Sequence, residues 1–175
     1  AFGTMQFNPK MDPEVVRKAK AEGRVHLNFV VSLYRFQIRR GKHFLHEHPA
    51  TALSWKEDKV LDLLKHPEVL SVVADQCQYG LTSKSPEGVE LPALKPTRFM
   101  TNSPQMRNRL SHRCNRLHKH QPLTGGRCAA AAFYPLKLVK AILLGIKDTA
   151  EALEMKKNMY SEHASLIHAI TESAG

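Results

Sequence analysis

The sequence predicts an α/β fold: a Rossmann-like open sheet, mostly parallel, with helices on both faces. Helix and strand patterns alternate over residues 12–74. Residues 69–74 are β-branched and apolar, as in a buried parallel strand. The chain has 175 residues and 42% apolar content, enough for one domain with a real core. We assign residues 1–147 to this α/β unit, truncated at its N-terminus, and residues 148–175 to a helical extension or tail.

The first helix is predicted from its start signal and its periodicity. Asp12 precedes Pro13, and proline is favoured in the first turn of a helix. Gly41 is placed to end the helix. Between them, apolar residues recur at helical spacing: Leu27, Val30, Val31, Tyr34 and Ile38.

Three strands are expected to be neighbours in one sheet, mostly parallel. They are predicted at residues 43–47, 69–74 and 98–101. Ser54 and Glu57 have the spacing of a capping box, which predicts a helix between the first two strands. Trp55, the only tryptophan, is interpreted as a core anchor, with stacking on a base as the alternative.

The C-terminal part combines a basic insert with a long helix. Residues 102–128 form the insert, which is poor in apolar residues and is expected to be exposed apart from a short helix beginning at Ser103 and Pro104. A second helix is predicted to begin at Pro135, and its continuation past Asp148 is interpreted as a tail or a partner-binding helix. Its predicted apolar face contains Leu136, Val139, Ile142 and Leu143.

The charge of the chain predicts a polyanionic partner. Lysine and arginine outnumber aspartate and glutamate by 26 to 16, a net charge of +10. Neutralising phosphates releases counterions, so nucleic acid is the expected partner, DNA more than RNA. The alternative is a basic but inert surface.

The cysteine count predicts the compartment. Three cysteines are few and odd in number, which argues against a disulfide framework and predicts an intracellular protein, nuclear or cytoplasmic. No apolar stretch reaches membrane-spanning length, so no membrane is expected as a partner.

Polar motifs follow the predicted strands. His46-Glu47-His48-Pro49 ends the first strand, Asp75-Gln76-Cys77-Gln78-Tyr79-Gly80 follows the second, and Lys95-Pro96-Thr97-Arg98 opens the third. In this order the motifs resemble those of cytosine-C5 DNA methyltransferases, over roughly residues 29–146. Tyr134-Pro135-Leu136 is similar to the last motif of that family. The string looks closer still to a divergent branch found in retroelement-like polyproteins.

The resemblance implies roles for residues and a cofactor, S-adenosylmethionine, in the parent chain. Glu47 would hydrogen-bond a flipped cytosine and Arg98 would steady it, the two meeting in one crevice near Tyr79. His48 and Lys95 would contact the substrate. The Gly-rich cofactor loop and the Pro-Cys nucleophile of the family do not occur in this sequence. We therefore expect the supporting half of a methyltransferase core, inactive alone, with the remainder of a larger polypeptide upstream.

Two alternatives to this interpretation come from different classes of protein. One is a non-catalytic, basic nucleic-acid-binding module of a mobile-element polyprotein. The other, and the weaker, is a zinc-dependent nuclease or deaminase. A deaminase needs a His-X-Glu motif and a later Cys-X-X-Cys motif. His46 and Glu47 are adjacent rather than spaced by one residue, and no Cys-X-X-Cys occurs in the sequence.

A zinc site is predicted in the basic insert. Cys114, His118 and His120 offer the thiolate and imidazole ligands that zinc prefers, and Cys77 is expected to complete the set. His112 and Cys128 are further candidates. Alternatively, Cys114 packs while the two histidines join a phosphate-binding surface formed with Arg113, Arg116 and Lys119.

Overall fold

The computed structural model describes residues 11–123 and 131–173, without the side chains of residue 166 and residues 168–173. The chain begins with α1, Pro13–Arg39, as predicted. Asp12 caps this helix by accepting a 2.8 Å hydrogen bond from the Glu14 amide. Gly41 follows the helix with a φ of 62°, a left-handed conformation that favours glycine. Within the described residues, no helix is long and apolar enough to cross a membrane.

The three predicted strands do form one sheet, but they are not paired in parallel. The strands are β1, Leu45–Pro49; β2, Leu70–Asp75; and β5, Pro96–Thr101. Their order is β1-β5-β2, and β5 is antiparallel to both neighbours. The expectation of a mostly parallel sheet was therefore wrong.

The connections between the strands explain this difference. β1 and β2 run in the same direction, because both are antiparallel to β5, and they are joined by a helical connection. Residues 80–95 then form a small hairpin, β3 (Thr82–Lys84) and β4 (Glu90–Pro92), which returns the chain to the end of β2. There the Gln76 backbone amide donates to the Lys95 carbonyl over 3.2 Å. From that point β5 can only run back between the other two strands.

The connection from β1 to β2 begins differently from the predicted capping box. It consists of a 3₁₀ turn, η2 (Leu53–Lys56), and the helix α2 (Asp58–Leu64), whose N-cap, Glu57, makes no side-chain capping bond. The Glu57 carboxylate instead pairs with Arg24 of α1 at 2.6 Å. The Ser54 hydroxyl hydrogen-bonds Nδ1 of His48. These tertiary contacts compete with the local capping pattern.

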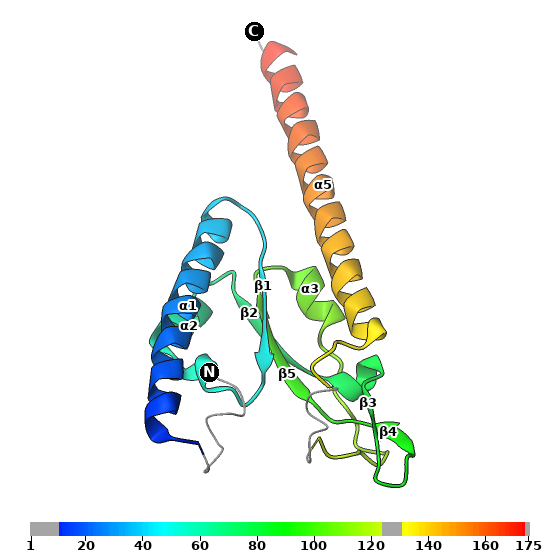
Figure 1. Cartoon of the computed structure of the whole chain (residues 1–175). Coiled ribbons are helices and arrows are strands. Elements are labelled where there is room, and N and C mark those ends of the chain that lie inside the picture. The colour runs from blue at the N-terminus through cyan, green and yellow to red at the C-terminus, as the bar shows by residue number, and fades with distance from the viewer. Residues whose placement is uncertain (1–10, 124–130, 174–175) are drawn as a thin grey trace.

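Helices cover both faces of the sheet, as predicted (Figure 1). The helices α1 and α2 lie on one face, and α3 (Pro104–Arg109) and α5 (Leu136–Ser173) lie on the other. Neighbouring residues of β5 point their side chains to opposite faces of the sheet, because side chains alternate along a strand. Met100 belongs to the core beneath α1 and α2, and Phe99 to the core beneath α3 and α5.

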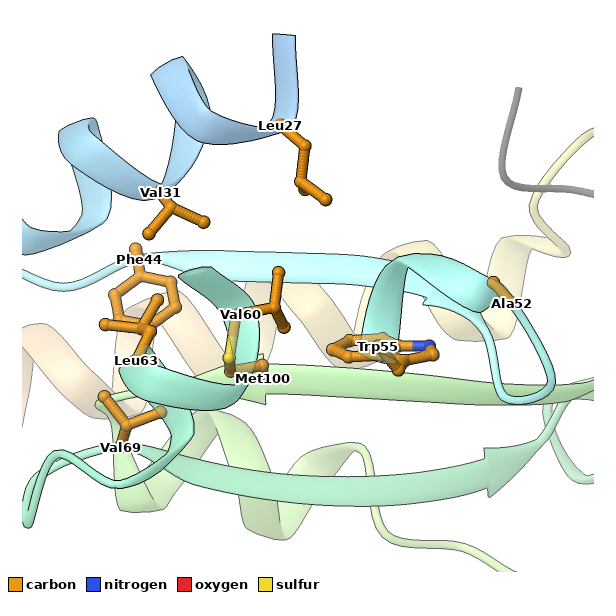
Figure 2. Close-up of a cluster of buried hydrophobic side chains, with 9 residues drawn as sticks. All are labelled: Leu27, Val31, Phe44, Ala52, Trp55, Val60, Leu63, Val69 and Met100. Carbon is orange, nitrogen blue, oxygen red and sulfur yellow. The ribbon is translucent and has the colours of Figure 1, made fainter. Parts of the chain in front are cut away.

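The core beneath α1 and α2 is the larger group of buried apolar residues (Figure 2). Trp55 is 3% exposed there, and its indole Nε1 donates to the Pro49 carbonyl over 2.9 Å. The interpretation of Trp55 as a core anchor is therefore confirmed. The other members of this core are Leu27, Val31, Phe44, Ala52, Val60, Leu63, Val69 and Met100.

α5 packs on the body through its first half and then extends well beyond it (Figure 1). It is one continuous helix, so the domain boundary expected between residues 147 and 148 falls inside it. Of the predicted apolar face, Leu136 and Leu143 are 82% and 60% exposed. Leu138, which was not predicted, is fully buried on α5 instead.

Candidate metal centre and basic groove

The four predicted zinc ligands lie together. Cys77, Cys114, His118 and His120 each offer one ligand atom, and these atoms all lie within 4.8 Å of one another. Each ligand atom is a cysteine sulfur or a histidine ring nitrogen, and all four residues are half-buried. The cluster could hold a metal ion. Of the other candidates, His112 lies outside the cluster and Cys128 lies outside the described residues.

Cys77 is supplied by the turn that follows β2. This 3₁₀ turn, η3, spans Gln76–Tyr79, and it ends at Gly80 with a φ of 85°. In this conformation the Gly80 amide donates to the Cys77 carbonyl over 3.1 Å. A residue with a Cβ atom rarely adopts such a φ, so Gly80 fixes the turn that presents Cys77.

The other three ligands come from residues 111–123, which we call the metal-ligand segment. The segment contains neither helix nor strand. Arg116 has a φ of 64°, uncommon for a residue other than glycine, and its amide points at the Cys114 sulfur at 3.3 Å. This tight turn returns the chain, so Nε2 of His118 and Nε2 of His120 lie 3.6 Å and 3.5 Å from the same sulfur.

A buried carboxylate holds the metal-ligand segment against the sheet. Asp75, at the end of β2, has no exposed surface. Its Oδ2 accepts a hydrogen bond from the Cys114 amide at 2.9 Å and pairs with Arg113 Nε at 3.0 Å. The Asp75 amide in turn donates to the His112 carbonyl. The carboxylate therefore positions the Cys114 backbone without being a ligand itself, as outer partners of metal sites do.

The electrostatics of the cluster suit a cation. Burial, followed by the adjoining Cys114 thiol, raises the pKa of the Cys77 thiol to about 11. Burial, followed by the charges of His118 and Arg116, lowers the pKa of His120. The lowered pKa favours the neutral form of the His120 imidazole, which is its ligand form, and a bound metal ion would favour the thiolate form of Cys77.

A basic groove lies beside the cluster, on the other side of η3. Its volume is about 240 Å³. Tyr79 hydrogen-bonds the Arg109 carbonyl at 2.9 Å across this groove, and its ring contacts the His112 ring. The cationic or titratable side chains that line it are Arg109, His112, Lys137 and Lys140. Arg109 is paired with Asp148, so the two lysines are the main source of unpaired positive charge in the groove.

Sequence reasoning missed Lys137 and Lys140, although a signal was present. No acidic residue occurs between Glu90 and Asp148, whereas eleven lysines and arginines do. The two lysines stand three residues apart at the start of α5, where they share a face of the helix. Charge counted over this whole stretch, rather than over the insert of residues 102–128, would have included them.

The predicted phosphate-binding residues have different surroundings. Arg116 and Lys119 are exposed, whereas Arg113 is paired with Asp75. Lys95 donates its Nζ to the Ala131 carbonyl at 2.8 Å, which fixes it against the loop before α5. Arg116 and Lys119 are therefore the most available of the predicted cations.

Glu47 and Arg98 do not meet in one crevice. Glu47 stands opposite Phe99 in the sheet, and Arg98 stands opposite His48. Opposite residues share a face of an antiparallel pair and successive residues alternate, so Glu47 and Arg98 point to opposite faces. The expected convergence was therefore wrong, because the antiparallel register of β5 was not foreseen.

Each of the two residues has its own partners. The Glu47 carboxylate accepts a 2.7 Å hydrogen bond from the Tyr134 hydroxyl, whose pKa is raised by burial and by that carboxylate. Arg98 donates to the Ser71 hydroxyl at 2.7 Å and lies over the Trp55 ring, 4.7 Å from its centroid. Arg98 therefore lies among the side chains of the α1 face, away from Tyr79.

Comparisons with known proteins do not indicate a function for the chain. It matches no family model, no curated protein and no solved structure.

Proposed function

We propose that this protein is a basic nucleic-acid-binding module in which a structural zinc ion organises the binding surface. The observation that carries the proposal is the convergence of Cys77, Cys114, His118 and His120 within 4.8 Å. Their segment has almost no buried side chains to fold it, and basic residues stand between and beside the ligands. The metal would take the place of the missing core, and the cations would contact phosphates.

The ligand set and its spacing support zinc. Two thiolates and two imidazoles form a closed tetrahedral set, the arrangement of structural rather than catalytic zinc. With Zn–S near 2.3 Å and Zn–N near 2.0–2.1 Å, tetrahedral geometry requires a sulfur–nitrogen separation of about 3.5 Å. The two separations from the Cys114 sulfur are 3.6 and 3.5 Å. Because all four positions are filled by protein, no open position remains for chemistry at the metal.

Zinc content tests this part of the proposal. Purified protein should contain about one zinc per chain by elemental analysis, and Cys114→Ser should lose it. His112→Asn is the matched control: His112 belongs to the same segment, but its ring lies against Tyr79. The control should keep its zinc. A wild-type protein that is folded without metal and insensitive to chelators would contradict the proposal.

The charge distribution supports nucleic acid as the partner. Arg116 and Lys119 of the metal-ligand segment and Lys137 and Lys140 of the basic groove flank the cluster on two sides. Phosphate contacts of this kind give affinity that falls with salt and depends little on sequence. We therefore propose that the nucleic acid is bound through its phosphate backbone rather than its bases, and we take duplex DNA as the test ligand.

Salt-dependent binding tests this second part. Reversing Lys119, Lys137 and Lys140 to glutamate should weaken binding to duplex DNA and flatten the slope of log K against log salt by about 2 to 3. Arg113 is left unchanged because its loss would disturb Asp75 and the metal site. The control reverses three exposed lysines on α1, on α2 and directly after α2: Lys18, Lys59 and Lys65. Equal losses in both variants would show that only net charge matters.

A second candidate function follows from the resemblance to cytosine-C5 DNA methyltransferases. Two observations favour it: β1 and β2 run in the same direction through a helical connection, and Glu47 stands near the carboxyl end of β1. In a chain that also carries a Gly-rich cofactor loop and a Pro-Cys motif upstream, Glu47→Gln should abolish methyl transfer and spare folding. Unchanged methylation would assign Glu47 a structural role, through its bond to Tyr134.

A further inference from the structure

From Ile146 onward, α5 carries an exposed apolar stripe with a seven-residue repeat. Ile146, Leu153 and Tyr160 stand seven residues apart and are 54%, 45% and 67% exposed. Ile167 continues the series. The alternate positions, four residues after each member, are Ala150, Lys157 and Ala164. A repeat of this kind, sustained over three to four heptads, is typical of a coiled-coil seam.

This stripe lies beside the face that packs α5 on the body, and residues of both line one apolar groove. The packed face presents Leu138, Ile142 and Thr149, and Gly145 lies against Met106 of α3 so closely that a Cβ atom would clash. From Leu153 to Ser165 every side chain is exposed. Helices in proteins gain most of their stability from packing an apolar face, so the stripe indicates that a partner covers it.

The charge of this helix suits a second copy of the same chain. Residues 148–175 contain two lysines and five acidic residues, a net charge of −3. Residues 1–147 contain 24 basic and 11 acidic residues, a net charge of +13, and the two parts sum to +10. Two copies that meet along α5 join a stretch of the chain that is acidic. This acidic helix is unsuited to nucleic acid, and it keeps the basic bodies apart.

We infer that two copies of this chain associate through the exposed stripe of α5 as an antiparallel pair, centred between Lys157 and Tyr160. This inference does not depend on the proposed function. In this register Lys157 of one chain meets Tyr160 of the partner copy, Leu153 meets Ala164, and Ala150 meets Ile167. Each of these contacts pairs a small or unbranched side chain with a larger one, so the side chains fill the seam evenly along its length.

A parallel pair would be worse in two ways. It would place Lys157 against its own copy, and like charges at a seam repel. It would also leave layers of two alanines beside layers of two large residues. In the antiparallel pair, the ammonium group of Lys157 lies beside the aromatic ring of Tyr160, where a cation is attracted to the ring face.

An apolar groove at the base of the stripe accommodates the end of the partner helix. The groove has a volume of about 370 Å³ and lies between α5, α3 and the start of β1. Ile146, Ala150 and Leu153 line it on the α5 side, and Phe44 and Leu45 line it on the sheet side. An antiparallel partner brings its C-terminal turns to this groove. A parallel partner would instead bring its own body there.

Sedimentation equilibrium of the full chain tests the association. Wild type should have twice the 19.7 kDa chain mass. Leu153→Glu with Tyr160→Glu should raise the dissociation constant by about 100-fold or more, because each removes apolar contact and introduces an unpaired carboxylate. The matched control is Met155→Glu with Met159→Glu: both methionines are about as exposed as Tyr160 but lie off the stripe. This control should stay a dimer.

A charge exchange tests the antiparallel register. Tyr160→Lys should dissociate the dimer, since it places a second ammonium group beside Lys157 of the other copy. Adding Lys157→Glu to that variant should restore the dimer, because each introduced lysine then faces a glutamate. In a parallel pair the double variant would set like charges against each other in both layers.

Three results would overturn the inference. The first is a wild-type protein that is monomeric at about 100 µM, a concentration well above most specific dimer dissociation constants. The second is equal dissociation of the seam variant and the methionine control. The third is failure of the double variant to restore association. Circular dichroism of each variant, with the urea unfolding midpoint followed at Trp55 as a second check, distinguishes a dissociated but folded chain from an unfolded one.

Discussion

The core beneath α1 and α2 and the metal-ligand segment are ordered by opposite means. The first buries nine apolar side chains from two helices, a turn and the sheet. The second, residues 111–123, buries only Gln121, and it leaves Leu117 86% exposed. The segment is instead held by a buried carboxylate and by a cluster of four potential metal ligands.

The difference shows how one short chain can order two regions independently. Apolar burial gives a non-directional stabilisation that tolerates changes in polar chemistry. The metal-ligand segment depends on a few directional contacts, and the loss of one of them removes much of its order. Changes in the first region should therefore alter global stability, and changes in the second should alter metal binding.

The largest expected effect comes from the core. Leu63 is fully buried, so Leu63→Ala should lower the free energy of unfolding by about 2 to 5 kcal/mol, through lost transfer energy and a residual cavity. Urea unfolding measures this loss. The zinc content of the folded fraction should stay at its wild-type value. Joint loss of zinc and stability would show that the two regions are not independent.

Acid should destabilise the same core through His46. Burial, followed by the charge of His48, lowers the pKa of His46 to about 4, from an ordinary value of 6.5. Its ring hydrogen-bonds Tyr34 and contacts Trp55 edge-on. Between pH 6.5 and 4 the unfolded chain binds the extra proton, so stability falls as pH falls through this window, by at most about 3 kcal/mol.

Trp55 fluorescence provides the measurement for this pH effect. The unfolding midpoint in urea, followed at Trp55, should decrease from pH 6.5 to 4 in the wild-type protein. In His46→Gln, which cannot gain a proton, the decrease should be smaller. Parallel curves for the two proteins would assign the acid effect to other groups, including the metal ligands.

A smaller effect is expected from Asp75, in the second region. Asp75→Asn removes the charge that pairs with Arg113 and weakens the hold on the Cys114 amide. Zinc affinity should fall about 10- to 100-fold, as for other outer partners of metal ligands. Competition with a chelator of known affinity measures it. The urea midpoint followed at Trp55 should change little, in contrast to that of Leu63→Ala.

The smallest effect is expected at a surface ion pair. Arg35 of α1 and Asp62 of α2 approach to 2.6 Å, but Asp62 is 65% exposed. Arg35→Ala should cost no more than about 1 kcal/mol, because solvent screens exposed pairs. This variant serves as the baseline for the other three. A larger loss would mean that the packing of the Arg35 side chain contributes.

The sequence by itself determined most of the secondary structure and which cysteines and histidines form the cluster that could hold a metal ion. Asp12 with Pro13, and Ser103 with Pro104, predicted two helix starts, because capping and proline geometry are local. Cys77, Cys114, His118 and His120 were predicted to lie together and do so, since thiols and imidazoles are scarce in the chain and their chemistry is specific.

Only the tertiary structure decided how the strands pair and where the site residues point. The direction of β5 depends on where the hairpin of β3 and β4 returns the chain, and no residue of β5 itself encodes that. Once β5 was antiparallel, the period of two placed Glu47 and Arg98 on opposite faces. Likewise, the sequence predicted a second apolar helix after Pro135, but packing on α3 decided that Leu138 is buried and that Leu143 faces solvent.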